Sequence, residues 1–578
     1  MSSRRAVWGF VLGMTLIGAG VLTAAIALRG PHATTAAPAV LVWDVPDELS
    51  EGEPPRRPFG FGWLHHVRPT MLDVLDLLDH ATNDDHVRAL VLHVGDLDWG
   101  WARLGEVRDA IARFHATGKP VYAYVESGGD PEYFLATVAD VIALPPAGTL
   151  QVDGLSATAT FLRGALDKLN VHPNFAQAGE YKSAVEFFTR GQMSPAAREA
   201  LDALLDDTFR VLVDSLATGR GLPPDSIRAL IDEGPFSARE ARRAGLADTL
   251  SYEEQIDSLA VRHAGPGVEA VMMSHYDAAQ RPRWGARVAY VSASGEIASG
   301  KSRVEADGTQ VIGSETLVKT LRDVRERRSL KAVVLRIDSP GGEVDASDEI
   351  WHEVRRLAAV KPVIVSMSDL AASGGYYIAA PATKIVAQPG TITGSIGVFA
   401  GKLNVLGLYQ KLGLNVEVLT RGRHAGLMSP FRDFTPEEAA RFQAHVDDSY
   451  RIFLSRVANG RHLTTGAVDH IARGRVWSGL SARPRALVDS LGGIPLAFHL
   501  ALQAAGLPED SPFAMEEYPR TQQSFFERVL QGWLDEEADD NADASARLLP
   551  EAVRTWVAMA LLPPGHPLAM MPWTIRIR

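Results

Sequence analysis

The feature that most constrains the fold of this chain is an internal repeat at a spacing of about 242 residues. In the front copy, Arg88–Val94 precedes Lys119–Val125, and in the rear copy Lys331–Ile337 precedes Lys361–Val365 in the same order. A repeat of this length is a whole domain rather than a solenoid module of about 20 to 50 residues. Both copies alternate short β-branched runs with helical patterns, which predicts parallel sheets covered by helices. We therefore expect an α/β protein built from two tandem copies of one domain.

The limits of the two copies follow from their opening strands and from the residues between them. Val40–Trp43 opens the front copy and Val288–Val291 opens the rear copy, and glycine and proline punctuate residues 265–287. We divide the 578 residues into an N-terminal segment, a front copy, a rear copy and a C-terminal tail with an acidic stretch, at 1–39, 40–275, 276–515 and 516–578.

The N-terminal segment predicts a single transmembrane helix. Arg4 and Arg5 precede an uncharged run from Ala6 to Leu28, whose 23 residues make a helix of about 34 Å. That length crosses a hydrocarbon core of about 30 Å, and the arginines predict a cytoplasmic tail with the bulk of the chain outside. A cleaved signal peptide is the alternative, because Thr23–Ala27 contains small residues. The apolar run exceeds the usual length of about 7–15, so we expect an uncleaved anchor.

Composition excludes several classes of protein. The net charge of −12 and the lack of a basic run argue against a nucleic-acid surface. The chain has no cysteine, which excludes disulfides, thiol catalysis and cysteine metal sites. We expect neither a metal nor a cofactor.

Ser373 is the candidate nucleophile. It follows a strand of the rear copy in Ala371–Tyr377 (Ala-Ala-Ser-Gly-Gly-Tyr-Tyr), ahead of a helix-compatible stretch. A serine at such a turn presents its hydroxyl at a helix N-terminus, where amides and the helix dipole favour a developing anion. The plain alternative is an N-cap serine that stabilises the helix by about 1 kcal/mol.

A glycine-rich turn precedes that serine by one strand and one helix. Ile337–Glu343 (Ile-Asp-Ser-Pro-Gly-Gly-Glu) ends the previous strand, and such a turn exposes backbone N–H groups. We predict that the amides of Gly342 and Gly374 form an oxyanion hole, and an ordinary type II turn is the alternative.

Lys182 is the candidate general base. The chain has ten lysines among 58 basic residues, and no histidine near Ser373 in the sequence has a setting that marks it as a base. Arginine stays protonated, whereas a buried lysine can be neutral near pH 7. Apolar and aromatic residues surround Lys182, including Tyr181 and Val185. The alternative is a surface lysine paired with Glu186.

These motifs together resemble the long-form signal peptide peptidase A family. The resemblance covers about Val40 to Met515 and is carried by four blocks, Ile337–Gly342, Ala372–Tyr377, Gly394–Gly397 and Tyr181–Glu186 followed by Met193–Pro195. It implies a crotonase- and Clp-like fold, Ser373 as nucleophile and Lys182 as base. It also implies a homotetramer anchored in the bacterial inner membrane, with its catalytic domains on the outer side. The implied substrates are apolar peptides, the signal-peptide remnants left after secretion.

The repeat predicts that each copy has lost what the other keeps. At an offset of 243 residues Ser373 falls on Asp130, and at 242 Lys182 falls on His424. Ser127 lies just upstream of Asp130 and is a relic at best. One active site is therefore expected per chain, shared between the copies.

The expected reaction is peptide hydrolysis through an acyl-enzyme, with Ser395 as a possible orienting partner of the Lys182 amine. Three alternatives remain open at this point. A crotonase-fold acyl-CoA hydratase or isomerase would need an acidic pair. An α/β-hydrolase, suggested by Ala371-x-Ser373-x-Gly375, would need a downstream Asp and His. A non-catalytic envelope scaffold would need neither residue.

Overall fold

The computed structural model describes residues 37–52, 69–276, 284–305, 309–508, 511–519 and 568–570. The transmembrane helix predicted from Ala6 to Leu28 and the acidic stretch of the tail lie outside these ranges. Within the described ranges, no helix combines the length and the apolar character that crossing a membrane requires.

The front copy is built on a six-stranded parallel sheet. Its strand order is β10 (Glu269–Met272), β1 (Ala39–Val45), β2 (Val87–Val94), β3 (Val121–Val125), β5 (Val141–Leu144) and β9 (Thr249–Leu250). The central strands are buried almost throughout, as expected where helices cover both faces of a parallel sheet.

The rear sheet repeats that order. β23 (Phe513–Tyr518), β11 (Ala286–Ser294), β15 (Leu330–Ser339), β17 (Val363–Ala372), β18 (Lys384–Ala387) and β22 (Ser490–Leu491) lie side by side in parallel. β17 also continues alongside β19 (Ile392–Gly394), which pairs with β21 (Val476–Ser478). The predicted duplication is therefore confirmed. β23 runs across the boundary placed at residue 515, because it pairs with β11 as far as Tyr518.

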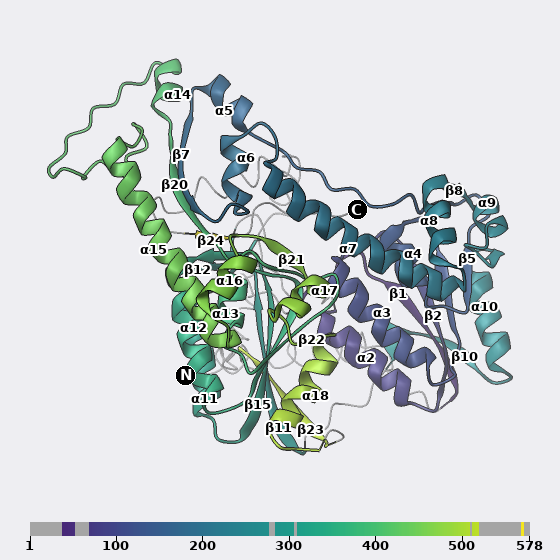
Figure 1. The fold of residues 1–578 in the computed structure, drawn as a ribbon. Coiled ribbons are helices and arrows are strands. Elements are labelled where there is room, and N and C mark those ends of the chain that lie inside the picture. Colours follow the sequence, from purple (N-terminus) through teal and green to yellow (C-terminus); the bar gives the residue numbers. More distant parts are fainter. Residues whose placement is uncertain are drawn as a thin grey trace, which may run out of the picture.

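The helices repeat as well (Figure 1). In the front copy they are α2 (Met71–Asn83), α3 (Trp101–His115), α4 (Asp130–Ala136), α5 (Arg163–Leu169), η1 (Ser183–Val185), α6 (Glu186–Thr189), α7 (Pro195–Arg220), α8 (Pro224–Glu233), α9 (Ala238–Arg243), α10 (Glu253–Ala264) and η2 (Met273–His275). In the rear copy they are α11 (Ser314–Glu326), α12 (Val344–Ala358), α13 (Gly374–Ala379), α14 (Leu406–Lys411), α15 (Pro436–Arg461), α16 (Thr465–Ile471), α17 (Gly479–Ala482), η3 (Arg483–Arg485) and α18 (Ile494–Ala504).

The longest helices, α7 and α15, are equivalent in the two copies and are capped in the same way. Each has 26 residues and starts with proline after a capping hydroxyl, Ser194 or Thr435, whose oxygen accepts a backbone N–H. Each ends at a left-handed residue, Gly221 or His462.

Side-chain hydrogen bonds also recur at equivalent positions. The Tyr133 hydroxyl donates to the Leu246 carbonyl at 2.7 Å, and the Tyr376 hydroxyl donates to the Leu487 carbonyl at 2.9 Å. These two equivalent hydrogen bonds fix the alignment of the two copies at the serine turn. Asp130 lies three residues before Tyr133, and Ser373 lies three residues before Tyr376.

A third sheet joins the two copies. Its order is β13 (Arg303–Val304), β14 (Gln310–Gly313), β12 (Glu296–Ala298), β16 (Gly341–Glu343), β24 (Leu568–Met570), β20 (Val398–Asn404) and β7 (His172–Ala178). β7 belongs to the front copy and pairs antiparallel with β20 of the rear copy along its whole length. A fourth, small sheet contains β4 (Gly128–Gly129), β6 (Thr149–Gln151) and β8 (Phe236–Ser237).

The hydrophobic core also crosses from one copy to the other. One continuous cluster contains Leu75 and Leu104 from the front helices together with Tyr290, Val334 and Phe498 from the rear copy. The opposite face of the rear sheet packs in a second cluster against α11, α12, α13 and α15. The two copies therefore pack as one body.

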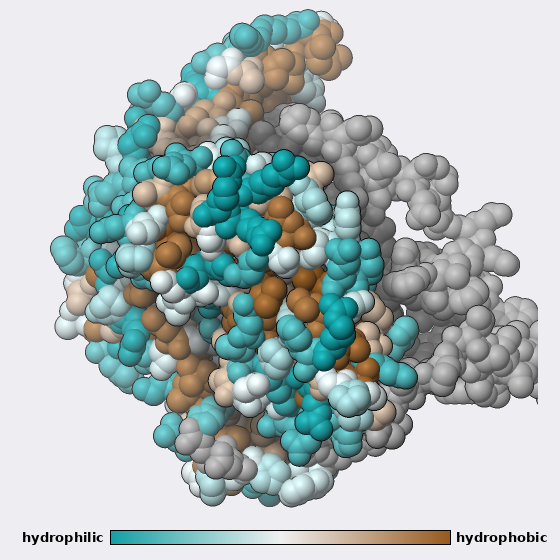
Figure 2. All heavy atoms as spheres, turned by 90° about the vertical axis from the view of Figure 1, so that its right-hand side faces the viewer, coloured by the Kyte–Doolittle hydropathy of each residue, from teal (hydrophilic) through white to brown (hydrophobic). Residues whose placement is uncertain are grey.

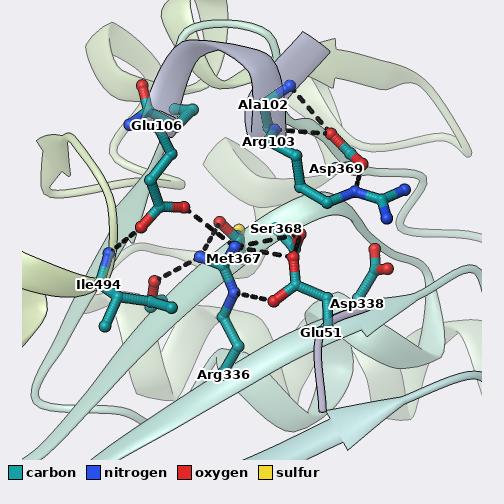
Figure 3. A network of polar contacts seen from close by, with 12 residues as sticks. Glu51, Ala102, Arg103, Glu106, Arg336, Asp338, Met367, Ser368, Asp369 and Ile494 are labelled. Atoms are coloured by element: carbon teal, nitrogen blue, oxygen red, sulfur yellow. Dashed lines mark hydrogen bonds and ion pairs between the residues drawn. The ribbon is translucent and has the colours of Figure 1, made fainter. Parts of the chain in front are cut away.

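A buried charge network lies where the copies meet (Figure 3). The fully buried Arg336 guanidinium donates to both Glu51 carboxylate oxygens at 2.7 and 2.8 Å, and lies 3.0 Å from Glu106. Burial alone would raise the pKa of Glu51, but the adjacent Arg336 holds it below its ordinary value. Removing one partner of such a pair costs about 3–5 kcal/mol, since it leaves a buried charge uncompensated. The network therefore favours one arrangement of the two copies.

Candidate active site

Ser373 lies in a strained turn between β17 and α13. Its φ of 55° is uncommon for a residue with a side chain, and such strain is typical of functional turns. The Ser373 N–H donates to the Gly394 carbonyl at 2.8 Å, and its carbonyl accepts from the Tyr377 N–H at 2.8 Å. These bonds hold the turn that the Ala-Ser-Gly-Gly pattern predicted.

Lys182 reaches this turn from the front copy. It lies four residues beyond the end of β7 and immediately before η1, and its side chain is fully buried. The Nζ atom donates to Ser373 Oγ at 2.7 Å, to Ser395 Oγ at 3.0 Å and to the Ser395 carbonyl at 3.1 Å. The structure thus brings together Ser373, Lys182 and Ser395, as the sequence predicted.

The environment of the Lys182 amine favours its neutral form. Burial lowers the pKa of Lys182 well below its ordinary value of 10.5, and desolvation is the cause. The three acceptors around Nζ are hydroxyl and carbonyl oxygens rather than a carboxylate. A neutral amine at 2.7 Å from a serine hydroxyl can take its proton, which is the arrangement that nucleophilic catalysis needs.

The Lys182 backbone is held by a segment that the sequence reasoning did not identify. The Tyr181 N–H donates to the Arg473 carbonyl at 2.8 Å, and the Gly474 N–H donates to the Ile396 carbonyl at 2.8 Å. A Cβ on Gly474 would lie 2.5–2.6 Å from Lys182 backbone and Cβ atoms, and Gly474 has a φ of 81°. Only a glycine lets the base approach so closely, and a glycine between two arginines is a weak signal in the sequence.

Gly374 lies at the start of a helix, as expected, whereas Gly342, which was expected in a turn, lies in a short strand. Gly342 is the middle residue of β16, where a Cβ would lie 1.8 Å from the Ile297 carbonyl oxygen. Gly374 is the first residue of α13, and a Cβ on the next residue, Gly375, would lie 2.8 Å from the Ser339 carbonyl oxygen. The serine turn and the Pro-Gly-Gly turn are therefore packed backbone against backbone.

The front copy has an altered version of the serine turn. Asp130 occupies the Ser373 position, and Pro131, which has no N–H, occupies the Gly374 position. The Glu132 carboxylate accepts from the amides of Leu97 and Gly129 at 2.8 and 2.7 Å. The front copy therefore has no amide at the position of Gly374, and the Glu132 carboxylate is hydrogen-bonded to backbone amides nearby.

His424, the counterpart of Lys182 in the rear copy, does not pair with Asp130, the counterpart of Ser373 in the front copy. His424 lies 3.8 and 3.9 Å from Glu437 and Glu438, whereas Asp130 accepts from the Gly154 N–H at 3.1 Å. Ser127, the possible relic, is exposed and lies 3.4 Å from Asp96. Within the described ranges the serine–lysine contact exists once, as the sequence predicted.

The duplicated fold and the buried serine–lysine contact define a serine peptidase. A family model described as "Peptidase family S49" matches residues 113–265 and 355–507, one match in each copy. The chain belongs to peptidase family S49, and the resemblance to the long-form signal peptide peptidase A family is confirmed.

Three curated relatives cover most of both chains. The chloroplastic serine protease SPPA of Arabidopsis thaliana is 32% identical over 479 residues, 79% of this chain and 71% of the relative. Protease 4 of Salmonella typhi is 30% identical over 508 residues, 85% of this chain and 79% of the relative. Protease 4 of Haemophilus influenzae is 31% identical over 466 residues, 76% of this chain and 74% of the relative.

Replacing Gly474 with alanine should reduce peptide hydrolysis about 100-fold, because the added Cβ displaces the Lys182 backbone and with it the amine. The measurement is kcat on an apolar fluorogenic peptide, with circular dichroism as the test of folding. Gly466→Ala is the matched control, since a Cβ there meets nothing within 4 Å. Equal activity of both variants would show that the Gly474 contact does not position the base.

Proposed function

We propose that this serine peptidase is an endopeptidase that digests signal-peptide remnants, with Ser373 as nucleophile and Lys182 as general base. The observation that carries the proposal is the 2.7 Å hydrogen bond between the Lys182 amine and the Ser373 hydroxyl, both of which are fully buried. Its amine base distinguishes this site from the acid pair of a hydratase and from the histidine of an α/β-hydrolase.

The reaction follows from this geometry. Neutral Lys182 takes the hydroxyl proton while Ser373 Oγ attacks the peptide carbonyl carbon. The amides of Gly342 and Gly374 stabilise the oxyanion, an effect of roughly 3–4 kcal/mol per donor in comparable sites. Protonated Lys182 then gives its proton to the leaving amine of the substrate. This regenerates neutral Lys182, which activates a water that hydrolyses the acyl-enzyme. Ser395 orients the amine through both of its oxygens.

Apolar residues next to the base support an apolar peptide as substrate. Ala184 and Val185 follow Lys182 in the chain, are buried, and pack with Phe399 of the rear copy. The dry surroundings that keep the amine neutral also favour apolar over charged substrate side chains. Signal peptides have an apolar central region, which matches these surroundings.

We also propose a crotonase- and Clp-like fold for each copy, and one uncleaved anchor over residues 6–28 in a bacterial inner membrane with both copies on the outer side. The uncharged run of 23 residues after Arg4 and Arg5 supports this orientation.

A homotetramer is proposed from the repeat and from the surface. β7 of the front copy pairs with β20 of the rear copy, but residues 415–421, which match β7 in the rear copy, form no strand. This part of the chain exposes Leu412, Leu414, Val418 and Leu419. Hydrophobic side chains gather on the projection at the top of Figure 2, where Figure 1 places α14. A neighbouring copy in a closed ring would cover them.

Ser373→Ala and Lys182→Ala should each lower the hydrolysis of apolar fluorogenic peptides by about 10⁴-fold or more, since each removes one half of the catalytic pair. Ser127→Ala is the matched control and should retain activity. Labelling of wild type, but not of Ser373→Ala, by a fluorophosphonate probe would add independent support. Activity on a crotonyl thioester with no peptide hydrolysis would instead favour a hydratase, and no labelling would favour a scaffold.

The rate should rise with pH through the lowered pKa of Lys182, because only the neutral amine accepts the serine proton. The measurement is kcat/KM from mildly acidic to mildly alkaline pH, with folding followed at each value. A flat profile in a protein that stays folded would show that another group is the base.

The full chain should resist alkaline extraction from membranes, and in mild detergent its mass should correspond to four copies. Leu419→Asp should lower that mass, because the side chain is 92% exposed and its loss does not disturb a core. Val360→Asp, at an exposed position on the chain after α12, is the control. An unchanged mass in the Leu419 variant would contradict the proposed interface.

A further inference from the structure

The rear-copy loop that holds the backbone of the general base also binds the residues before the base through two arginine side chains. The Arg473 guanidinium donates to the Glu180 carboxylate at 3.3 Å, and the Arg475 guanidinium donates to the Tyr181 hydroxyl at 3.4 Å. Gly474, between the two arginines, is the residue against which the backbone of the base packs. The rear copy therefore holds the segment that leads to the base from both sides of one glycine.

Arg475 is the more enclosed of the two arginines, since its side chain is 16% exposed against 47% for Arg473. Its guanidinium carbon lies 5.0 Å from the centre of the Tyr181 ring and 4.3 Å from the centre of the Trp477 ring. A guanidinium within about 6 Å of an aromatic face is attracted to it. Arg475 also donates to the carboxylate of Glu199 on α7, which accepts from the Tyr181 hydroxyl at 3.1 Å. We call these four residues, Tyr181, Glu199, Arg475 and Trp477, the arginine clamp.

Tyr181 connects the arginine clamp to the apolar cluster beside the nucleophile. It packs there with Ala200 and Leu204 of α7 and with Ala372, the residue before the nucleophile. Exposure falls from 56% at the glutamate side chain of the clamp to 16% at its arginine and 0% at the general base. The clamp therefore lies between solvent and the buried amine.

The backbone of Arg475 supports the third group of the site. Its carbonyl accepts the Ser395 N–H at 2.7 Å, and Ser395 in turn accepts from Lys182 Nζ through its hydroxyl and its carbonyl. Ser395 has a φ of 50°, a conformation that persists only where its surroundings hold it. Arg475 is thus connected to the base in two ways, through Ser395 and through Tyr181.

The front copy, which has no serine–lysine pair, has no arginine at the equivalent position. β8 pairs with β6 as β21 pairs with β19, which makes Phe236 and Trp477 equivalent. Arg475 then aligns with Gly234, where a Cβ would lie 2.1 Å from the Val152 carbonyl oxygen. Of the two equivalent positions, only the one beside the nucleophile has an arginine side chain. This difference connects the arginine with catalysis rather than with the fold that the copies share.

We propose that Arg475 is a positioning residue for the general base. Its guanidinium holds the Tyr181 ring against α7 and so keeps water from the amine of the next residue in the chain. The inference rests on the proposed peptidase mechanism and adds a residue on which the reactivity of the base depends.

Access of water decides the charge of the Lys182 amine, because desolvation is the cause that lowers its pKa. Charged groups also lie on the elements around it, namely Glu180, Glu186, Glu199, Arg473 and Arg475. Loss of the arginine clamp admits water, so the pKa of Lys182 rises towards its ordinary value of 10.5. A smaller fraction of the amine is then neutral at pH 7, and the rate at that pH falls.

Arg475→Ala should displace the pH profile of kcat/KM for an apolar fluorogenic peptide by about one pH unit towards alkaline pH, which lowers the rate at neutral pH about tenfold. The loss should shrink as the pH rises, whereas purely structural damage lowers the rate equally at every pH. Arg485→Ala is the matched control and should have the wild-type profile. Arg485 also lies over the Trp477 ring, at 3.7 Å, but donates to the Ser481 carbonyl of its own copy. An undisplaced profile in Arg475→Ala, or an equal displacement in Arg485→Ala, would overturn the proposal.

Glu199→Ala provides a second variant should Arg475→Ala fail to fold. The Glu199 side chain is 56% exposed, so its removal leaves no buried cavity, but Arg475 loses its carboxylate partner. The pH profile should move in the same direction. An unmoved profile in a folded Glu199→Ala protein counts against the arginine clamp.

Hydrogen exchange separates the arginine clamp from the proposed chemistry. In the inactive Ser373→Ala background, the amides of Tyr181 and Lys182 should exchange about tenfold faster when Arg475→Ala is also present, because local opening becomes easier. Mass spectrometry of the segment 179–186 follows this exchange without hydrolysis. If the wild type cleaves no peptide but the exchange differs, the clamp stands and the proposed reaction fails. Equal exchange in the two proteins contradicts the clamp, whatever the activity of the wild type.

Discussion

The removal of water from one amine is the constraint on which the rest of this structure depends. In solution a lysine is protonated at neutral pH and cannot act as a base. Lys182 is buried, which lowers the pKa of its amine, and none of the three oxygens around Nζ belongs to a carboxylate that would stabilise the ammonium form. Neither copy alone provides this environment, because the lysine comes from the front copy and Ser373 and Ser395 come from the rear copy. The pairing of β7 with β20 therefore joins the two copies next to the contact between Lys182 and Ser373.

The divergence of the two copies can be followed at a single pair of positions. Arg336 on β15 and His93 on β2 are equivalent, since each follows the aligned leucine of its strand. Arg336 binds Glu51 across the copies, whereas His93 lies between Asp44 and Asp257 of its own copy at 2.8 and 2.9 Å. Burial alone would lower the pKa of His93, but the hydrogen bonds that its ring donates to the Asp257 and Asp44 carboxylates raise it to about 9. One ancestral position thus holds the copies together in one case and stabilises a single copy in the other.

The sequence was sufficient to predict the parts of the site that depend on residue type and on the repeat. The positions of Ser373 and Lys182 were predicted from the combined motifs and the resemblance to the family, because the local signals alone left an N-cap serine and a surface lysine open, and the loss of the serine at Asp130 was predicted from the repeat. Gly474 was missed, since its importance comes from a contact with Lys182, 292 positions away in the chain. β24 was missed for a similar reason, because three residues that pair with two distant strands leave no periodicity in the sequence.

Pro131 makes it difficult for the front copy to regain an active site of its own. A reversion of Asp130 to serine would restore a hydroxyl to the front copy but not the amide that Gly374 provides, because proline has no N–H. Glu132 would still occupy the amides of Leu97 and Gly129, and His424 would still stand where a lysine is needed. Asp130, Pro131 and His424 would therefore all have to change before the front copy had a serine, the amide and a lysine at these positions. The serine–lysine contact therefore requires that both copies remain in one chain or in contact.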